Sequence, residues 1–126
     1  MDTRNKIITA EAACELARGR EAALVTGYFD VLLAAHLREL RRVHDERPQA
    51  ALIVAVTAPP EPVLDARARA EMVAALAVVD YVVSLEGGQS ESLLAAFSPD
   101  RIVRLEAVHQ QRMRELIQHV HRRQSA

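Results

Sequence analysis

The residues with the clearest chemical potential surround a turn, where the apolar run Ala22 to Thr26 ends at Gly27 and opens into a helical pattern. In general, the free amides that open a helix favour phosphate, and a glycine before them allows close approach of the backbone. Asp30 and His36 add a carboxylate and an imidazole to the same segment. The pattern is typical of a nucleotide-binding turn.

The elements that must position this turn can be read from the apolar residues around it. Short apolar runs predict strands that are buried on both faces of a sheet. These runs cover residues 22–26, 52–56, 81–83 and 101–103. The run Leu52 to Val56 is the clearest, because it is rich in branched residues and is stopped by Pro59-Pro60.

Helical patterns separate these strands. Thr9 can cap a helix that begins at Ala10 and stops at Gly19. A second, amphipathic helix is expected from Val31, because apolar side chains recur on one face at Leu33, Leu37 and Leu40. Further helices are expected at 66–77 and 91–97. A loop at Gly87-Gly88 is expected between the third strand and the helix at 91–97. The last helix carries an apolar stripe of Met113, Leu116, Ile117 and Val120.

Strands that alternate with helices at this spacing require right-handed crossovers and a mostly parallel sheet. The sequence therefore predicts a three-layer, doubly wound α/β fold with helices on both faces. Its length of 126 residues suits a single domain with one core.

Composition narrows the classes of partner. The 16 Lys and Arg residues balance 17 Asp and Glu residues, so charge gives no argument for nucleic acid or a membrane surface. Charged residues interrupt every apolar stretch, and the polar amino terminus lacks a signal-peptide pattern. The single cysteine, Cys14, cannot form an intrachain disulfide and is expected to be a small buried residue. We expect a cytoplasmic protein that binds neither nucleic acid nor membranes.

The segment Thr26 to His36 resembles the turn of the cytidylyltransferase-like nucleotidyltransferases, whose pattern is T-x-G-x-F-D-x-x-H-x-G-H. It is most similar to the adenylyltransferase domain of the bifunctional heptose-phosphate enzymes and to glycerol-3-phosphate cytidylyltransferase. Later segments match the family in order and spacing, namely Leu52 to Val56, Val79 to Val83 and Pro99-Asp100. The resemblance implies one domain over residues 1–126, a short version of the Rossmann-like fold with about four strands and a leading helix.

The resemblance also implies a reaction. A nucleotidyl group would pass from ATP or CTP, accompanied by Mg²⁺, to a sugar or polyol phosphate with release of pyrophosphate. Such catalysis depends on positioning and on donors placed around the phosphates. His36 would be the catalytic residue, no cofactor would be tightly bound, and a homodimer is possible. The residues implied to bind nucleotide are Thr26, Gly27, Tyr28, Phe29, Asp30, Leu33, Ala35, His36 and Arg104.

The chain departs from the family where donors are needed. Leu33 stands in place of the first histidine and Ala35 in place of the glycine. Loss of one preorganised donor costs about 3 kcal/mol, or about 10² to 10³ in rate. No lysine follows Lys6, and the loop after Thr57 is short. Arg104 and the leucine after it stand where the family has a Lys-Gly pair. These departures predict a degenerate, weak or silent nucleotide-binding module.

Two alternative functions stay open. Arg104, Arg69 or Arg67 could replace the missing groups in an active nucleotidyltransferase. The chain could also be a non-enzymatic oligomeric scaffold, if the leading helix and the alanine-rich helix 66–77 pack on a second copy.

Structural interpretations stand beside the functional ones for the residues of the turn. His36 could lie on the edge of a core-facing helix, and Asp30 is more often a helix N-cap than a ligand contact in such a place. Gly27 is expected to be needed for the backbone angles that glycine can adopt. Phe29 is expected to lie in the core.

Side chains outside the turn have simpler interpretations. Arg69 and Glu71 are expected to be solvated or paired with their neighbours. His119 and His121 lie two apart on a helix and face different directions, so no metal site is expected.

Overall fold

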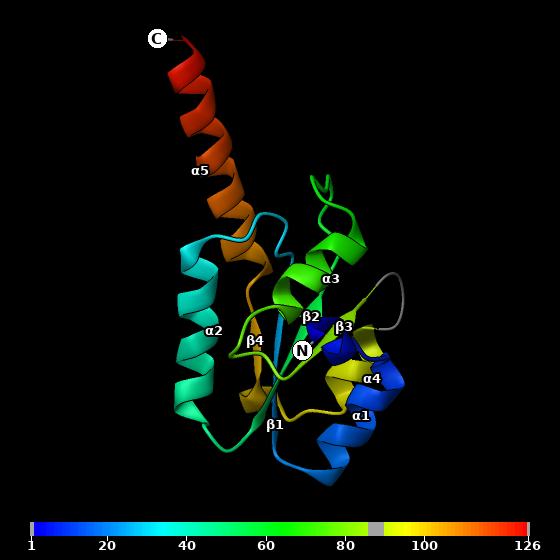
Figure 1. The fold of residues 1–126 in the computed structure, drawn as a ribbon. Coiled ribbons are helices and arrows are strands. Elements are labelled where there is room, and N and C mark those ends of the chain that lie inside the picture. The colour runs from blue at the N-terminus through cyan, green and yellow to red at the C-terminus, as the bar shows by residue number, and fades with distance from the viewer. Residues whose placement is uncertain (1, 86–89, 126) are drawn as a thin grey trace.

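The computed structural model describes residues 2–85 and 90–125, in which strands alternate with helices (Figure 1). The strands are β1 (Ala22–Gly27), β2 (Ala51–Val56), β3 (Tyr81–Ser84) and β4 (Ile102–Arg104). The α-helices are α1 (Ala10–Gly19), α2 (Ala34–Glu46), α3 (Ala66–Ala74), α4 (Ser90–Ala95) and α5 (Glu106–Ser125). Short 3-10 helices lie at Thr3–Lys6 and Pro99–Arg101.

The strands form one parallel sheet in the order β3-β2-β1-β4. Gly27 at the end of β1 lies opposite Val56 of β2, and Thr26 lies opposite Arg104 of β4. Both β1 and β2 are buried along their whole length, as expected of strands covered on two faces. The predicted three-layer α/β fold is confirmed. The strand order reverses between β1 and β4, so a crevice is expected at the carboxyl ends of this pair.

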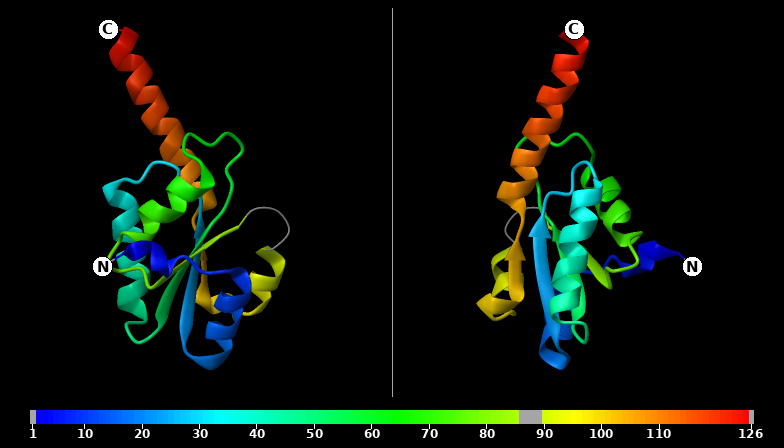
Figure 2. Two further views of the ribbon diagram at one scale, coloured as in Figure 1. Left: turned by 45° about the vertical axis from the view of Figure 1, so that its right-hand side comes forward. Right: turned by 90° about the vertical axis from the view of Figure 1, so that its left-hand side faces the viewer.

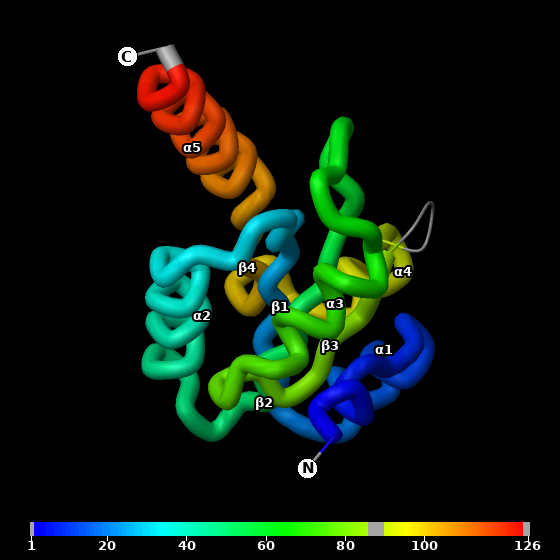
Figure 3. Tube along the Cα trace, turned by 45° about the horizontal axis from the view of Figure 1, so that its top comes forward, coloured from blue at the N-terminus to red at the C-terminus, as the bar shows by residue number. Residues whose placement is uncertain are grey.

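Helices cover both faces of the sheet, and the two groups can be followed in Figure 3. Adjacent side chains on a strand point to opposite faces, so Val25 and Leu24 enter different clusters. Val25 packs in a first cluster with Leu40 of α2 and residues of α3. Leu24 packs in a second cluster with Leu93 of α4 and residues of α1. Cys14 of α1 lies buried in the second cluster, as predicted.

Most helix boundaries match the prediction within a few residues. Thr9 caps α1 by accepting a hydrogen bond from the Ala12 amide at 3.1 Å. The main difference is α2, which begins at Ala34 and not at Val31. The chain first turns through Phe29, whose φ of 46° is left-handed, and extended Leu33 becomes the N-cap. The expected loop at Gly87-Gly88 lies outside the described residues.

Several alanines of the two helices that could pack on a second copy serve this chain's own core. Ala13 of α1 and Ala70 and Ala74 of α3 are buried in the two clusters. Their burial leaves these positions unavailable to another molecule.

The last helix, α5, starts beside the carboxyl end of β1 and projects away from the body of the domain (Figure 2). Its start is fixed by a hydrogen bond of 2.8 Å from the Leu105 amide to the Thr26 carbonyl. Within residues 2–85 and 90–125, no helix has the length and apolar character needed to cross a bilayer. The first turns of α5 lie over the strand ends, while Ile117 and Val120 farther along the helix are partly exposed.

Candidate functional site

The end of β1 is packed tightly against α5. A Cβ added to Gly27 would lie 2.5 Å from Cε1 of His109 and 2.8 Å from Cε2 of Phe29. The φ of Gly27 lies outside the left-handed region, so the role predicted from its backbone angles is wrong. Gly27 is needed because an imidazole from α5 lies directly on the backbone of the strand.

We expect Gly27→Ala to lower the free energy of unfolding by about 1 to 3 kcal/mol, because the added methyl group overpacks a buried contact. Gly19 is the matched control, since a Cβ there would meet nothing within 4 Å. Urea denaturation of the two alanine variants measures the difference. Equal stability of the Gly27→Ala and Gly19→Ala proteins would contradict this account.

His109 binds the main chain of the turn. Its Nδ1 accepts hydrogen bonds from the amides of Tyr28 at 3.2 Å and Phe29 at 3.5 Å. An imidazole nitrogen accepts only when it carries no proton, so the neutral ring is protonated at Nε2. Burial and, next, the charge of His36 lower the pKa of His109 to about 4, which keeps the ring neutral near pH 7. The turn amides are thus bound by the protein itself.

Three rings meet above the turn. The His109 centroid lies 4.6 Å from Phe29 and 4.5 Å from His36, both edge-on. Phe29 is fully buried, which confirms its predicted place in the core. His36 is also buried, and its Nδ1 accepts a hydrogen bond from the Leu33 amide at 2.9 Å. Burial and, next, the charge of Arg112 lower the pKa of His36.

A charged pair closes the far side of this cluster. Arg112 of α5 donates from both terminal nitrogens to the Glu39 carboxylate of α2, at 3.0 and 2.9 Å. Burial opposes the charge of Glu39, but the hydrogen bonds and attraction of Arg112 outweigh it and lower the pKa of Glu39. Nε2 of His109 lies 3.6 Å from the same carboxylate. The pair therefore fixes α5 to α2 and favours the tautomer of His109 that binds the turn.

Asp30 fastens the turn to a second loop. Its two carboxylate oxygens accept hydrogen bonds from the amides of Val63 and Leu64, each at 2.8 Å. The N-cap of α2 is Leu33, so the N-cap role favoured for Asp30 is wrong. Asp30 lies four residues before the first residue of α2, which is outside the capping position, and its carboxylate accepts from two adjacent amides instead. Asp30 fixes the path of the loop that follows β2.

Arg69 is a buried arginine that donates hydrogen bonds to three main-chain carbonyls. Its side chain donates to Thr57 at 2.6 Å, to Tyr28 at 3.2 Å and to Leu64 at 3.2 Å. Only 3% of Arg69 is exposed, so the expectation of a solvated or neighbour-paired side chain is wrong. The guanidinium joins the ends of β1 and β2 to the loop before α3. Arg69 therefore has a structural role and holds these segments together at the turn.

The start of α5 is tied to both central strands by one carboxylate. Glu106 accepts hydrogen bonds from the hydroxyls of Thr26 at 2.8 Å and Thr57 at 3.1 Å. The negative charge also lies in the first turn of the helix, where the helix dipole favours it. The Thr26 hydroxyl is therefore used to anchor α5.

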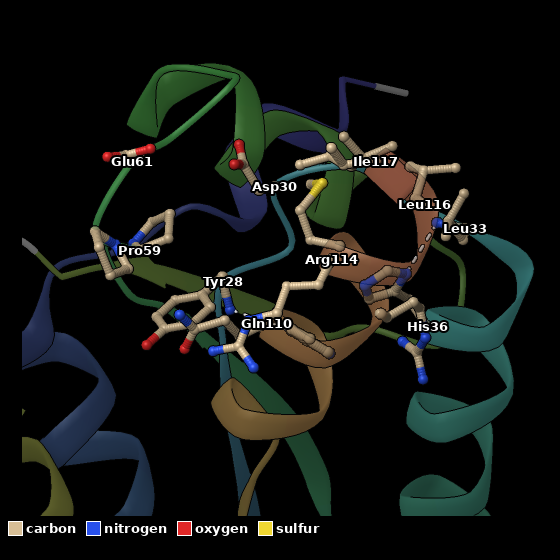
Figure 4. A pocket seen from close by; sticks show the side chains of 15 residues that line it. Tyr28, Asp30, Leu33, His36, Pro59, Glu61, Gln110, Arg114, Leu116 and Ile117 are labelled. Atoms are coloured by element: carbon tan, nitrogen blue, oxygen red, sulfur yellow. Dashed lines mark hydrogen bonds between the residues drawn. The ribbon is translucent and has the colours of Figure 1, made fainter. Parts of the chain in front are cut away.

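A cavity of about 360 Å³ opens between the turn after β1, the loop after β2 and α5 (Figure 4). Apolar side chains from all three segments line much of it: Val31, Leu33, Pro59, Pro60, Met113, Leu116 and Ile117. Polar groups come from Tyr28, Asp30, His36, Glu61, His109, Gln110, Arg112 and Arg114. The cavity lies at the carboxyl ends of the strands, where the strand order reverses.

The structure brings together most of the residues that the sequence nominated. Tyr28, Asp30, Leu33 and His36 line the cavity, and Thr26, Gly27 and Phe29 support it from below. Ala35 does not line it. Arg104 lies elsewhere, beside a separate hollow formed with α4. Within the described part of the chain, no three His, Cys, Asp or Glu side chains gather in a way that could hold a metal ion.

Sequence reasoning missed three residues that shape this site, namely His109, Glu39 and Glu106. Each lies on a helix in an unremarkable pattern, and its partner is far away in the sequence, as with Tyr28 and His109 at a separation of 81 residues. The only local signal was the acidic first residue of α5, Glu106, which is typical of a helix start.

Comparison with known proteins agrees with this arrangement. A family model described as "Cytidylyltransferase-like" matches residues 24–125. The chain is also similar to the bifunctional protein HldE of Trichlorobacter lovleyi, with 30% identity over 109 residues. That match covers 80% of this chain and 22% of the relative, so the chain spans about a fifth of the protein it resembles. With its parallel sheet, reversed strand order and match to the family model, the chain belongs to the cytidylyltransferase-like nucleotidyltransferase family.

Proposed function

We propose that this chain is a nucleotide-binding member of its family that has lost the chemistry of nucleotidyl transfer. The observation that carries the proposal is the state of the turn after β1. Its amides at Tyr28 and Phe29 are bound to His109, and the side chain at position 33 is an apolar leucine. A triphosphate at this point would find few of the donors that phosphoryl chemistry needs.

The charges around the cavity support the same proposal. Arg112, the cation nearest the histidines, is neutralised by Glu39 at 2.9 Å. The remaining lining arginine, Arg114, is exposed on α5. Asp30 and Glu61 add negative charge to the opposite wall. The cavity is therefore better suited to the apolar and neutral parts of a nucleotide than to three phosphates.

The direct test mixes the pure protein with ATP or CTP, Mg²⁺ and a panel of sugar phosphates and measures pyrophosphate. We expect no release above a blank without protein. In parallel, thermal unfolding with nucleosides and nucleotides should show small stabilisation by some of them, since a ligand that binds the folded state raises its apparent stability. Robust turnover that His36→Ala abolishes would instead establish the active-transferase alternative.

A restoration experiment probes the missing groups. Leu33 lines the cavity and Ala35 follows it at the start of α2, so Leu33→His with Ala35→Gly returns the family's residues. One new hydrogen bond to a charged ligand group is expected to tighten nucleotide binding about tenfold. Leu33→Ala with Ala35→Gly is the matched control, because it makes the same glycine change without the imidazole donor. Equal nucleotide affinities of the two double variants would contradict the claim that the nucleotide pocket of the family is preserved.

A further inference from the structure

We propose that the imidazole of His109 occupies the position of a ligand phosphate at the turn, so that the site selects nucleosides over their phosphates. This inference rests on the proposed function and adds the residue that determines the ligand class. It begins from the amides of Tyr28 and Phe29, which both point to Nδ1 of one buried ring. An anionic oxygen would be the usual acceptor for such adjacent amides at a loop before a helix.

The space beside these amides is also filled. The edge of the His109 ring lies so close to Gly27 that even a methyl group on that residue would collide with it. Phe29 and His36 pack edge-on against the same ring. A phosphate could reach the two amides only after the imidazole had left its place.

The surroundings keep the ring in this role. The Glu39 carboxylate lies 3.6 Å from Nε2, which favours a proton on that nitrogen and leaves Nδ1 free to accept. Glu39 is fixed in turn by two hydrogen bonds from Arg112. His109 lies on α5 one turn after Glu106, which binds both Thr26 and Thr57. These bonds hold the start of α5 in place, so the helix cannot easily move away to free the amides for a phosphate.

The rest of the cavity offers room and chemistry for an uncharged ligand. Its volume of about 360 Å³ is walled by prolines and by apolar side chains of α5, with Tyr28 and Gln110 as uncharged hydrogen-bonding groups (Figure 4). Four charged side chains also line it: Asp30 and Arg112 are already bonded within the protein, and Glu61 and Arg114 are exposed. Such mixed lining is typical of sites that bury a flat organic molecule and orient it with few polar contacts. A nucleoside fits this description without any anion contact at the turn.

The test uses inorganic pyrophosphate, adenosine and cytidine as probes and follows the backbone amides of Tyr28 and Phe29 by NMR. In the unmodified protein, pyrophosphate should leave both amide signals unmoved. His109→Ala removes the competing acceptor, so pyrophosphate should shift both signals and bind about tenfold or more tightly than to the unmodified protein. His109→Asn retains an acceptor oxygen close to the position of Nδ1 and should behave like the unmodified protein.

The control is His119→Ala, which changes an exposed histidine on the same helix and should leave pyrophosphate binding unaltered. Pyrophosphate shifts of Tyr28 and Phe29 in the unmodified protein would overturn the proposal, even if His109→Ala failed to fold. A folded His109→Ala protein with no gain in pyrophosphate binding would overturn it as well. Failure of both adenosine and cytidine to bind, with the pyrophosphate results as expected, would reject the nucleoside ligand and the proposed function while leaving the blocking role of His109 intact.

Discussion

Replacing Arg69 with alanine is expected to lower the free energy of unfolding by about 3 to 5 kcal/mol, because several hydrogen bonds from a buried, charged donor are lost together. The guanidinium joins the carbonyls of Tyr28, Thr57 and Leu64, at distances of 2.6 to 3.2 Å. The three carbonyls belong to partly buried residues, so truncation removes their donor and opens a cavity below the turn.

Arg67 provides the control for this substitution on the same helix. Its side chain is 81% exposed and pairs with Glu71, one turn away. Arg67→Ala should therefore change stability by less than about 0.5 kcal/mol. Urea unfolding followed by circular dichroism measures both variants. A loss below about 1 kcal/mol for Arg69→Ala would show that its carbonyl partners find water or other donors.

The second large effect is a loss of stability in mild acid. Burial and the charge of His36 lower the pKa of His109 from 6.5 to about 4 in the folded protein. Between these values the unfolded chain binds a proton that the folded protein excludes, so acid favours unfolding. The contribution of His109 is complete above about pH 6.5 and is lost as the pH falls toward 4. A shift of this size corresponds to about 3 kcal/mol.

Chemical unfolding at a series of pH values from 7 to 4 tests this expectation. His36, whose pKa is also lowered by burial, should add a change in the same direction. His109→Asn removes the largest titrating group while retaining an acceptor for the turn amides, so its stability should fall much less steeply. His119→Asn, at an exposed position, should retain the full slope. Parallel slopes for the unmodified and His109→Asn proteins would mean that His109 does not titrate as described.

The sequence alone determined the order of the elements and the class of fold. Runs such as Leu52 to Val56 and caps such as Thr9 are local signals, because burial on both faces and the chemistry of a helix start depend on neighbours in the chain. The turn at Gly27 was also visible, since a glycine between a strand and a helix is a local pattern. These predictions needed no knowledge of distant contacts.

Tertiary structure decided what the turn contains. Asp30 binds the loop at Val63, Arg69 binds carbonyls on three segments, and His109 reaches the amide of Tyr28 from 81 residues away. No local pattern announces such contacts, because each depends on how α3 and α5 are placed against the ends of β1 and β2. An isolated histidine or arginine in a helix has the same sequence signature whether it faces water or a buried amide. The position of the turn could thus be predicted from the sequence. The binding of its amides by His109 followed only from the packing of α5.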